Sequence, residues 1–235
     1  MYANKTGGYG GVTEPARPKS KSTNSYSYHI NDRNTNKKDI VTAAVTQNGL
    51  ALRYASLTLR DDDEVVKAAV TQDGSALKYA SPRLQNYKEF VKGLVQIDGL
   101  ALQGASFELQ NNDEVVKAAV TQNGSALQYA SEDLKNDKDV VTDAVTQLGS
   151  ALMYASTSLQ NDRKFVKGLV EINRSALHYA PKNLRNDRKF VLGLVTNNGN
   201  LLQYVLDKFK TDRGFVTAAV TQNGLALYHA DKFKN

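Results

Sequence analysis

Hydrophobic residues recur along this chain with a period of 25 residues, without insertion or deletion, from Val45 onward. One position of every copy is a valine, and a leucine seven residues later keeps the same register. A fixed period of this length is typical of proteins built from stacked structural units. The pattern therefore predicts an array of eight units. The valines are Val45, Val70, Val95, Val120, Val145, Val170, Val195 and Val220.

Within one unit, taken as residues 61–85, the first apolar residues have helical spacing. Val65–Val66 and Ala69–Val70 lie at i, i+1, i+4 and i+5, which places them on one stripe of a helix and not on one side of a strand. A second apolar segment covers residues 75–81, and Leu84 is expected to anchor a closing loop. Each unit should thus hold a helix of about three turns and one of about two.

Polar residues at fixed places mark the expected ends of the first helix. An Asn or Asp opens each unit as a candidate N-cap, and Asp61 and Glu64 have the spacing of a capping box. Gly74 and its equivalents are expected to end the helix in the left-handed conformation that glycine tolerates. The candidate N-caps are Asp61, Asn86, Asn111, Asn136, Asn161 and Asn186.

Helices this short are unstable alone in water, so each unit must be stabilised by packing on its neighbours. We therefore predict an all-α fold, an α-solenoid of eight 25-residue helix–turn–helix repeats over residues 39–235, with an extended N-terminal arm. Where Phe begins the apolar stripe, as at Phe90, a glycine follows one turn later. We expect this glycine to make room for the ring, whereas Phe215 is followed by Ala218 and departs from the pairing.

A tyrosine recurs at one position of most units. Such a column suits either packing between repeats, with the hydroxyl in solvent, or a platform on which bases stack, and we favour packing. Gly104 interrupts the column, which predicts a notch that either admits a partner side chain or marks looser packing. The tyrosines are Tyr54, Tyr79, Tyr129, Tyr154, Tyr179 and Tyr204.

Residues 1–38 differ from the array in kind. Four glycines surround Tyr9, Pro15 and Pro18 disfavour helix, and large apolar residues are few. This composition predicts an extended, intrinsically flexible basic arm. We expect the arm to contact partners through its aromatic and basic side chains, namely Tyr2, Tyr9, Arg17, Lys19, Lys21, Tyr26 and Tyr28.

The net charge of +6 is distributed unevenly. Residues 1–38 hold seven Lys/Arg against two Asp/Glu, residues 39–158 hold ten against sixteen, and residues 159–235 hold thirteen against six. In the last segment the cations gather in first turns of helices, where they oppose the helix dipole. We expect them to dock an anion or an acidic partner, the alternative being a solvated basic face. They are Arg163, Lys164, Lys167, Arg188, Lys189 and Arg213.

Signals of catalysis are weak. The chain has no cysteine, its three histidines lie apart, and no metalloprotease, nucleophile-elbow or phosphate-loop motif occurs. We therefore expect no enzyme activity, no cofactor and no metal site. No apolar run is long enough to span a membrane and no secretory signal is evident, so we expect an intracellular reducing compartment or a virus particle.

The segment Asn111–Ser131 reads NNDEVVKAAVTQNGSALQYAS. It resembles the repeat family named domain of unknown function 4116, and the similarity covers about residues 36–231. The resemblance implies short helical repeats and brings no assigned activity or functional residues. This chain departs from the pattern at Gly104, where Tyr is usual, and at Arg174, where Gly is usual.

Together these features favour a non-catalytic structural scaffold or linker subunit, one that binds other proteins in a larger assembly through its arm and solenoid surface, self-association included. One alternative is nucleic-acid or phosphate binding through the basic C-terminal repeats, which would show a steep salt dependence. Another is a host-directed effector or adaptor, which shares the same docking physics.

Overall fold

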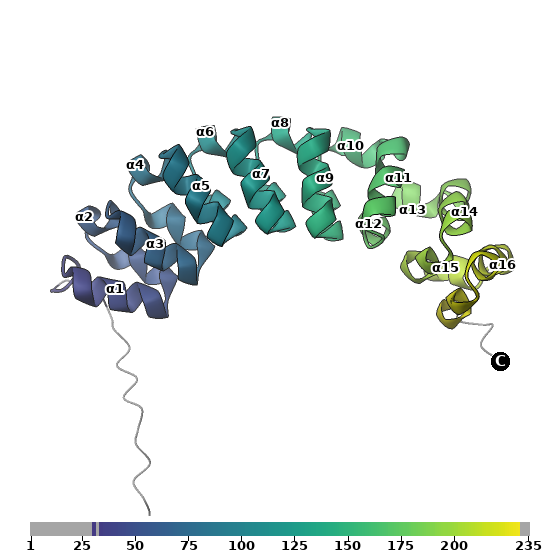
Figure 1. Cartoon of the computed structure of the whole chain (residues 1–235), viewed down its shortest axis with the longest axis horizontal. Helices are drawn as coiled ribbons and strands as arrows, with labels where there is room; N and C mark the ends of the chain where they lie inside the picture. Colours follow the sequence, from purple (N-terminus) through teal and green to yellow (C-terminus); the bar gives the residue numbers. More distant parts are fainter. Residues whose placement is uncertain (1–29, 32, 231–235) are drawn as a thin grey trace, which may run out of the picture.

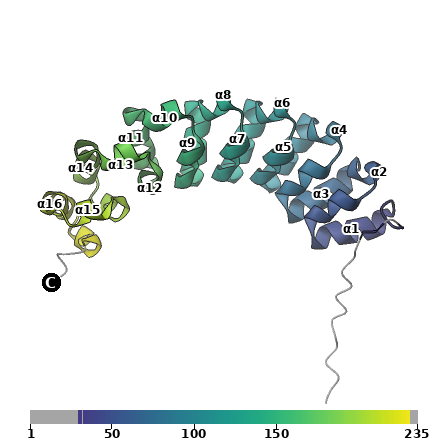
Figure 2. The ribbon, with the colours of Figure 1, turned by 180° about the vertical axis from the view of Figure 1, so that it is seen from behind.

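The computed structural model describes residues 30, 31 and 33–230, and it shows an arc of helical units lying side by side (Figures 1 and 2). Most described units have three elements: a ten-residue helix, a six-residue 3-10 helix and a short helix. The short helices up to α10 (Thr157–Asn161) lie on the outer rim of the arc. The all-α solenoid is confirmed. The prediction of two helices per unit, with Leu84 in a closing loop, is wrong. The second helix is a 3-10 helix in most units, and Leu84 lies on a third element.

The long helices are α1 (Lys38–Gln47), α3 (Asp63–Gln72), α5 (Lys88–Ile97), α7 (Asp113–Gln122), α9 (Lys138–Gln147), α11 (Arg163–Ile172), α14 (Arg188–Asn197) and α16 (Arg213–Gln222). The second elements are η1 (Gly49–Tyr54), η2 (Gly74–Tyr79), η3 (Gly99–Gly104), η4 (Gly124–Tyr129), η5 (Gly149–Tyr154), α12 (Ala176–Tyr179), η6 (Gly199–Tyr204) and η7 (Gly224–His229). The short helices are α2 (Leu57–Arg60), α4 (Pro82–Gln85), α6 (Phe107–Gln110), α8 (Glu132–Lys135), α10 (Thr157–Asn161), α13 (Lys182–Asn186) and α15 (Asp207–Lys210).

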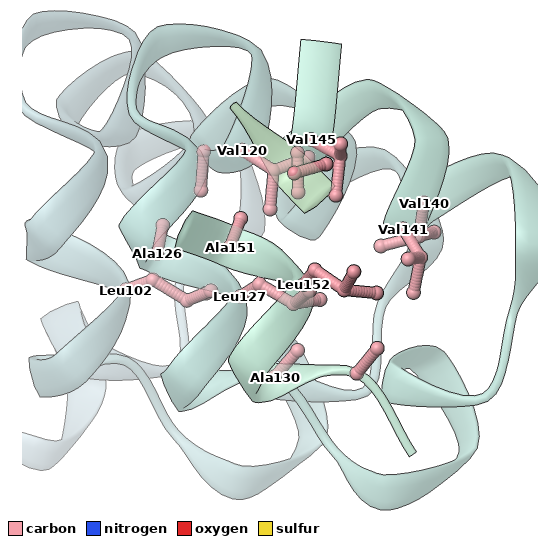
Figure 3. Packing of buried hydrophobic residues seen from close by; sticks show 14 of the residues in the cluster. Leu102, Val120, Ala126, Leu127, Ala130, Val140, Val141, Val145, Ala151 and Leu152 are labelled. Atoms are coloured by element: carbon pink, nitrogen blue, oxygen red, sulfur yellow. The ribbon is translucent and has the colours of Figure 1, made fainter. Parts of the chain in front are cut away.

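The core is one continuous cluster that crosses every unit boundary. Figure 3 shows Leu102, Leu127 and Leu152, one from each of three successive units, lying next to one another. All three side chains are completely buried. Because each unit covers the apolar side of the next, the burial that stabilises the short helices comes from their neighbours.

The helix caps lie one residue later than predicted. Asp62 is the N-cap of α3, and its carboxylate accepts hydrogen bonds from the N–H groups of Glu64 and Val65, each at 3.1 Å. Glu64 is therefore too early in the helix for a capping box, and it instead accepts a hydrogen bond from Lys38 of the preceding unit at 2.6 Å. The N-cap prediction for Asp61 and its equivalents is wrong by one position.

The residues predicted as N-caps instead tie neighbouring units together. Asn86 ends a short helix, and its side-chain oxygen accepts a hydrogen bond from Ser106 Oγ of the next unit at 2.6 Å. Ser106 also donates its backbone N–H to Gln85 O at 2.8 Å. Both bonds recur at Ser81, Ser131 and Ser156, and this double ladder stops at Pro181, which has no backbone N–H.

The repeat glycines have a steric role. No glycine of the described residues has a positive φ, so the left-handed C′ prediction is wrong. Asp73 ends α3 with extended backbone, and Gly74 starts the 3-10 helix. At Gly99, an added Cβ would lie less than 3.0 Å from the carbonyl oxygen of Ala119 on the next long helix. Glycine is therefore required because two units approach here too closely for any side chain.

Neighbouring long helices pack in two ways. The pairs α1–α3, α5–α7, α7–α9 and α14–α16 pack extensively, whereas α3–α5 and α9–α11 meet less and α11–α14 least. The second helix of an extensive pair has alanine at the contact position, as at Ala69 and Ala119, whereas the second helix of a looser pair has a buried leucine. A larger side chain at this point separates the helices. These leucines are Leu94, Leu169 and Leu194.

The expected balance between Phe and Gly is wrong. An added Cβ at Gly93, Gly168 or Gly193 would meet no atom within 4 Å, so these glycines do not make room for a ring. Phe215, which lacks such a glycine, is completely buried and stacks on Phe209 with ring centroids 4.3 Å apart.

Gly104 leaves no notch. It is buried, and an added Cβ would lie less than 3.0 Å from the backbone nitrogen of Lys78. The backbone of η2 therefore closes the space that a tyrosine would take, and η2 and η3 pack the most extensively of the 3-10 helices.

The array changes direction after α11. Arg174 stands where other units have the glycine, and a side chain at that position prevents the close approach of the next helix. Leu194 adds bulk at the same contact. Figures 1 and 2 show that α14 and α16 run at an angle to α7 and α9.

We expect Gly99→Ala to lower the free energy of unfolding by about 1–3 kcal/mol, because the new Cβ overlaps the next unit. The matched control is Gly224→Ala, at the same repeat position of the last unit, where an added Cβ meets no atom within 4 Å. This control should stay within about 0.5 kcal/mol of the wild type. Chemical denaturation measures both, and equal effects would contradict the steric account.

Leu127→Ala should lower the free energy of unfolding by about 2–5 kcal/mol, because it removes a completely buried side chain from the middle of the continuous core. Thermal unfolding of this variant beside Lys67→Ala, a change at an exposed residue, measures the difference. An unchanged midpoint for Leu127→Ala would show that the core is not continuous at this unit.

Candidate functional site

Two of the six predicted docking cations are engaged inside the array. Arg163 Nη1 lies 2.5 Å from Asp187 Oδ2, and its guanidinium lies 5.0 Å from the centre of the Phe190 ring. Arg188 makes the same contacts one unit later, with Asp212 at 2.6 Å and with the Phe215 ring. Each cation begins its own helix but is neutralised by the N-cap of the next helix, so its expected conflict with the helix dipole is offset.

The same pairing occurs elsewhere in the array. Lys38 contacts Asp62 at 2.9 Å, and Lys138 contacts Asp162 at 3.1 Å. The sequence signal is a basic residue at the start of one helix with an aspartate 24 residues later. These pairs join units, and they are exposed, so each stabilises the fold modestly.

The other four predicted cations are exposed. Lys167 lies 3.9 Å from Glu171, a long contact. For Lys164, Lys189 and Arg213 the described part of the chain shows no ion pair. The predicted contact residues of the arm, Tyr2, Tyr9, Arg17, Lys19, Lys21, Tyr26 and Tyr28, lie outside the described residues.

A groove of about 350 Å³ lies between α9 and α11. It opens here because Leu169 separates the two helices and Gly168 carries no side chain to fill the space. Its walls are mainly apolar, and Ile172 at one end remains 53% exposed. The lining residues are Lys138, Thr142, Asp162, Lys164, Phe165, Gly168, Leu169 and Ile172.

The charges of the groove lie at its opposite end, around the starts of α9 and α11. Lys138 of α9 is held by Asp162, the N-cap of α11, and lies 5.3 Å from the ring centre of Phe165. Lys164 forms no ion pair among the described residues. The groove thus combines an apolar wall with a cation for which the described part of the chain shows no ion pair. This arrangement suits a partner with a large apolar side chain and a nearby carboxylate.

Sequence reasoning missed this groove. Its signal is Phe–x–x–Gly–Leu–x–x–Ile, which occurs at Phe165–Ile172 and at Phe90–Ile97. In both helices the terminal isoleucine is exposed, Ile97 at 38%. From the sequence alone, this spacing is that of an ordinary buried helix stripe. The groove becomes evident only from the separation of α9 and α11.

The tyrosine column packs against the core. Tyr79, Tyr129, Tyr154 and Tyr204 are partly buried, which agrees with the favoured packing interpretation. Tyr54 and Tyr179 are more exposed than the other four.

The three histidines and the potential metal ligands are the sequence candidates for chemistry. His178 is exposed and meets only the edge of Tyr179 in a T-shaped contact among the ring contacts described. No group of three potential metal ligands occurs in residues 30, 31 and 33–230. Over the same residues, no helix is long and apolar enough to cross a membrane.

Comparison with protein families matches one family, described as domain of unknown function (DUF4116), over residues 37–85, 87–135, 112–160, 137–185 and 187–234. The chain belongs to the DUF4116 family. Each DUF4116 match spans about two units, and together the matches cover nearly all of the solenoid. No match was found among curated proteins or among solved structures.

We expect the ion pairs between DUF4116 units to lower the pKa values of their carboxylates, and titration measures this. The hydrogen bond from Arg163 and the N–H of Phe190 lower the pKa of Asp187 from 3.8 to about 2. The pair therefore stabilises the fold fully above pH 3.8, and this stabilisation is lost as the pH falls through about 2.

Arg163→Met should raise the pKa of Asp187 toward 3.8, although the Phe190 N–H still holds it slightly lower. NMR titration of side-chain carboxyl carbons measures the change. Asp212, whose pKa is lowered mainly by Arg188, is the internal control and should not move. An unchanged pKa of Asp187 would show that Arg163 does not pair with it in solution.

Proposed function

We propose that this DUF4116 chain is a non-catalytic scaffold or linker that binds other proteins, with the groove between α9 and α11 as a partner site. The observation that carries the proposal is the groove itself, an apolar hollow of about 350 Å³ next to the half-exposed Ile172. Apolar side chains left exposed beside a concave surface are typical of protein interaction sites.

A second apolar surface supports the same class of function. Leu57 and Phe107 begin α2 and α6 on the outer rim, and each is 79% exposed. Pro82 occupies the equivalent position of α4 between them. A row of apolar residues at one position of successive units offers an extended contact of the kind that solenoids use.

Phosphate or nucleic-acid binding has less support. Within the described part of the chain, Arg163 and Arg188 are neutralised by aspartates. The early units are acidic, whereas a dedicated nucleic-acid binder usually has a continuous basic groove. A host-directed effector or adaptor would use the same apolar surfaces and would differ only in the origin of its partner.

The test is capture of proteins from the native source by immobilised full-length chain, with wild type beside Ile172→Asp. The substitution places a charge on the apolar wall, so we expect capture of the specific partner to fall by about tenfold or more. The matched control is Ile97→Asp, the equivalent change on α5, which should leave capture unchanged. Circular dichroism and thermal unfolding verify that both variants fold.

Two results would overturn the proposal. One is a wild-type chain that recovers no specific protein. The other is recovered material that nuclease removes and that declines steeply with salt, which would favour nucleic-acid binding. Equal loss in both isoleucine variants would place the partner site outside the α9–α11 groove.

A further inference from the structure

The last described unit exposes a face of α16 and η7. In every interior unit, the equivalent face is covered by the unit that follows. Leu227 is 38% exposed on this face, whereas its seven equivalents are buried, and Val220 is partly exposed where its equivalents are completely buried. A hollow of about 250 Å³ lies here, lined by Arg213, Val216, Thr217, Val220, Thr221 and Leu227. Its lining corresponds to that of an interior joint, and no following unit is seated on it among the described residues.

Two polar groups on this face also lack the partners that interior joints supply. Arg213 is equivalent to Arg163 and Arg188, which pair with the next unit, but no ion pair of Arg213 is present in the described part of the chain. The N–H of Gly99 donates to Gln122 of the next unit at 2.7 Å. For the equivalent N–H of Gly224, no acceptor occurs among residues 30, 31 and 33–230.

The first unit supplies the complementary groups at the opposite end of the array. Gln47 of α1 is equivalent to Gln122 and Gln222, is exposed, and forms no side-chain hydrogen bond among those described. Asp39 is equivalent to Glu64, which pairs with a cation of the preceding unit, and is likewise exposed. Ala51 is partly exposed, whereas its alanine equivalents in other units are completely buried.

We propose that two copies of this chain associate head to tail, with the α16–η7 face of one copy seated on the α1–η1 face of the next. Arg213 then meets Asp39 as Lys38 meets Glu64 at 2.6 Å and as Lys88 meets Glu114 at 2.9 Å. The Gly224 N–H meets Gln47, and Val220 and Leu227 close over Ala51.

The residues before α1 are aligned with the first unit in the way that a short helix is aligned with the next unit elsewhere in the array. Ser56 N–H donates to Thr35 O at 2.7 Å, as Ser81 N–H donates to Arg60 O at 2.8 Å. The residues before α1 therefore occupy the place of a short helix, the element that the described part of the last unit does not contain. Lys37 stands where later units have an N-cap such as Asp62, which leaves Asp39 as the carboxylate for Arg213.

A joint between two different faces leaves one free face of each kind on a dimer, so further copies add in a line or close into a ring. Sedimentation velocity of the full chain should therefore show an average mass that rises with concentration and does not stop at a dimer. This proposal is independent of the α9–α11 groove. If the wild-type chain does not self-associate but still captures other proteins, the head-to-tail proposal is wrong and the proposed function stands.

The decisive variants reverse one charge on each face. Arg213→Glu alone and Asp39→Arg alone should each weaken association by about tenfold or more, because each places like charges together. Mixing the two variants should restore association, since opposite charges then meet at every joint between unlike copies. Lys189→Glu, a change at an exposed cation with no described ion pair, is the matched control and should associate as the wild type does.

Gly224→Ala adds a test that does not depend on charge. It should leave the unfolding of dilute protein unchanged while weakening association, because an added Cβ would meet a backbone carbonyl only when another unit docks. A wild-type chain that stays monomeric at all concentrations would overturn the proposal. Association that occurs only after removal of residues 231–235 would also overturn it, because those residues would then be the cover of this face. A mixture of the two charge variants that does not associate would overturn it as well.

Discussion

The structure depends on one steric constraint, which acts at four of the joints between units: the glycine that starts a 3-10 helix lies close to the carbonyl oxygen of the next long helix. At Gly49, Gly99, Gly124 and Gly199, this oxygen leaves no room for a Cβ. The approach brings the apolar stripes of two units into contact, so that residues such as Leu127 become completely buried. Since short helices are unstable alone, this contact is what makes each unit a folded element.

Departures from that contact shape the molecule. Leu169 replaces alanine at the helix–helix contact and separates α9 from α11, which opens the groove on which the proposed function rests. Arg174 replaces the glycine itself, and the array turns at the following joint. Pro181 ends the double ladder of hydrogen bonds at the same place. The later units therefore differ from the regular array through a few identifiable side chains.

Charged side chains join neighbouring units of the array. Basic residues at helix starts pair with aspartates one unit ahead and lie over phenylalanine rings, as Arg163 does with Asp187 and Phe190. Such pairs are exposed and individually weak, but their geometry sets the register between units. The surfaces that we propose for partners are the apolar groove, the apolar residues of the outer rim and the two ends of the described array.

The sequence by itself determined the all-α repeat architecture, the 25-residue period and the buried stripe, because apolar periodicity depends on local spacing along one helix. It misplaced the N-caps by one residue and assigned Asn86 to its own unit, although its side chain bonds to Ser106 of the next. It did not show that Arg163 pairs with Asp187 of the next unit. Only the tertiary structure decided these points, along with the groove and the direction of the arc, because each depends on distances between units that a single repeat does not contain.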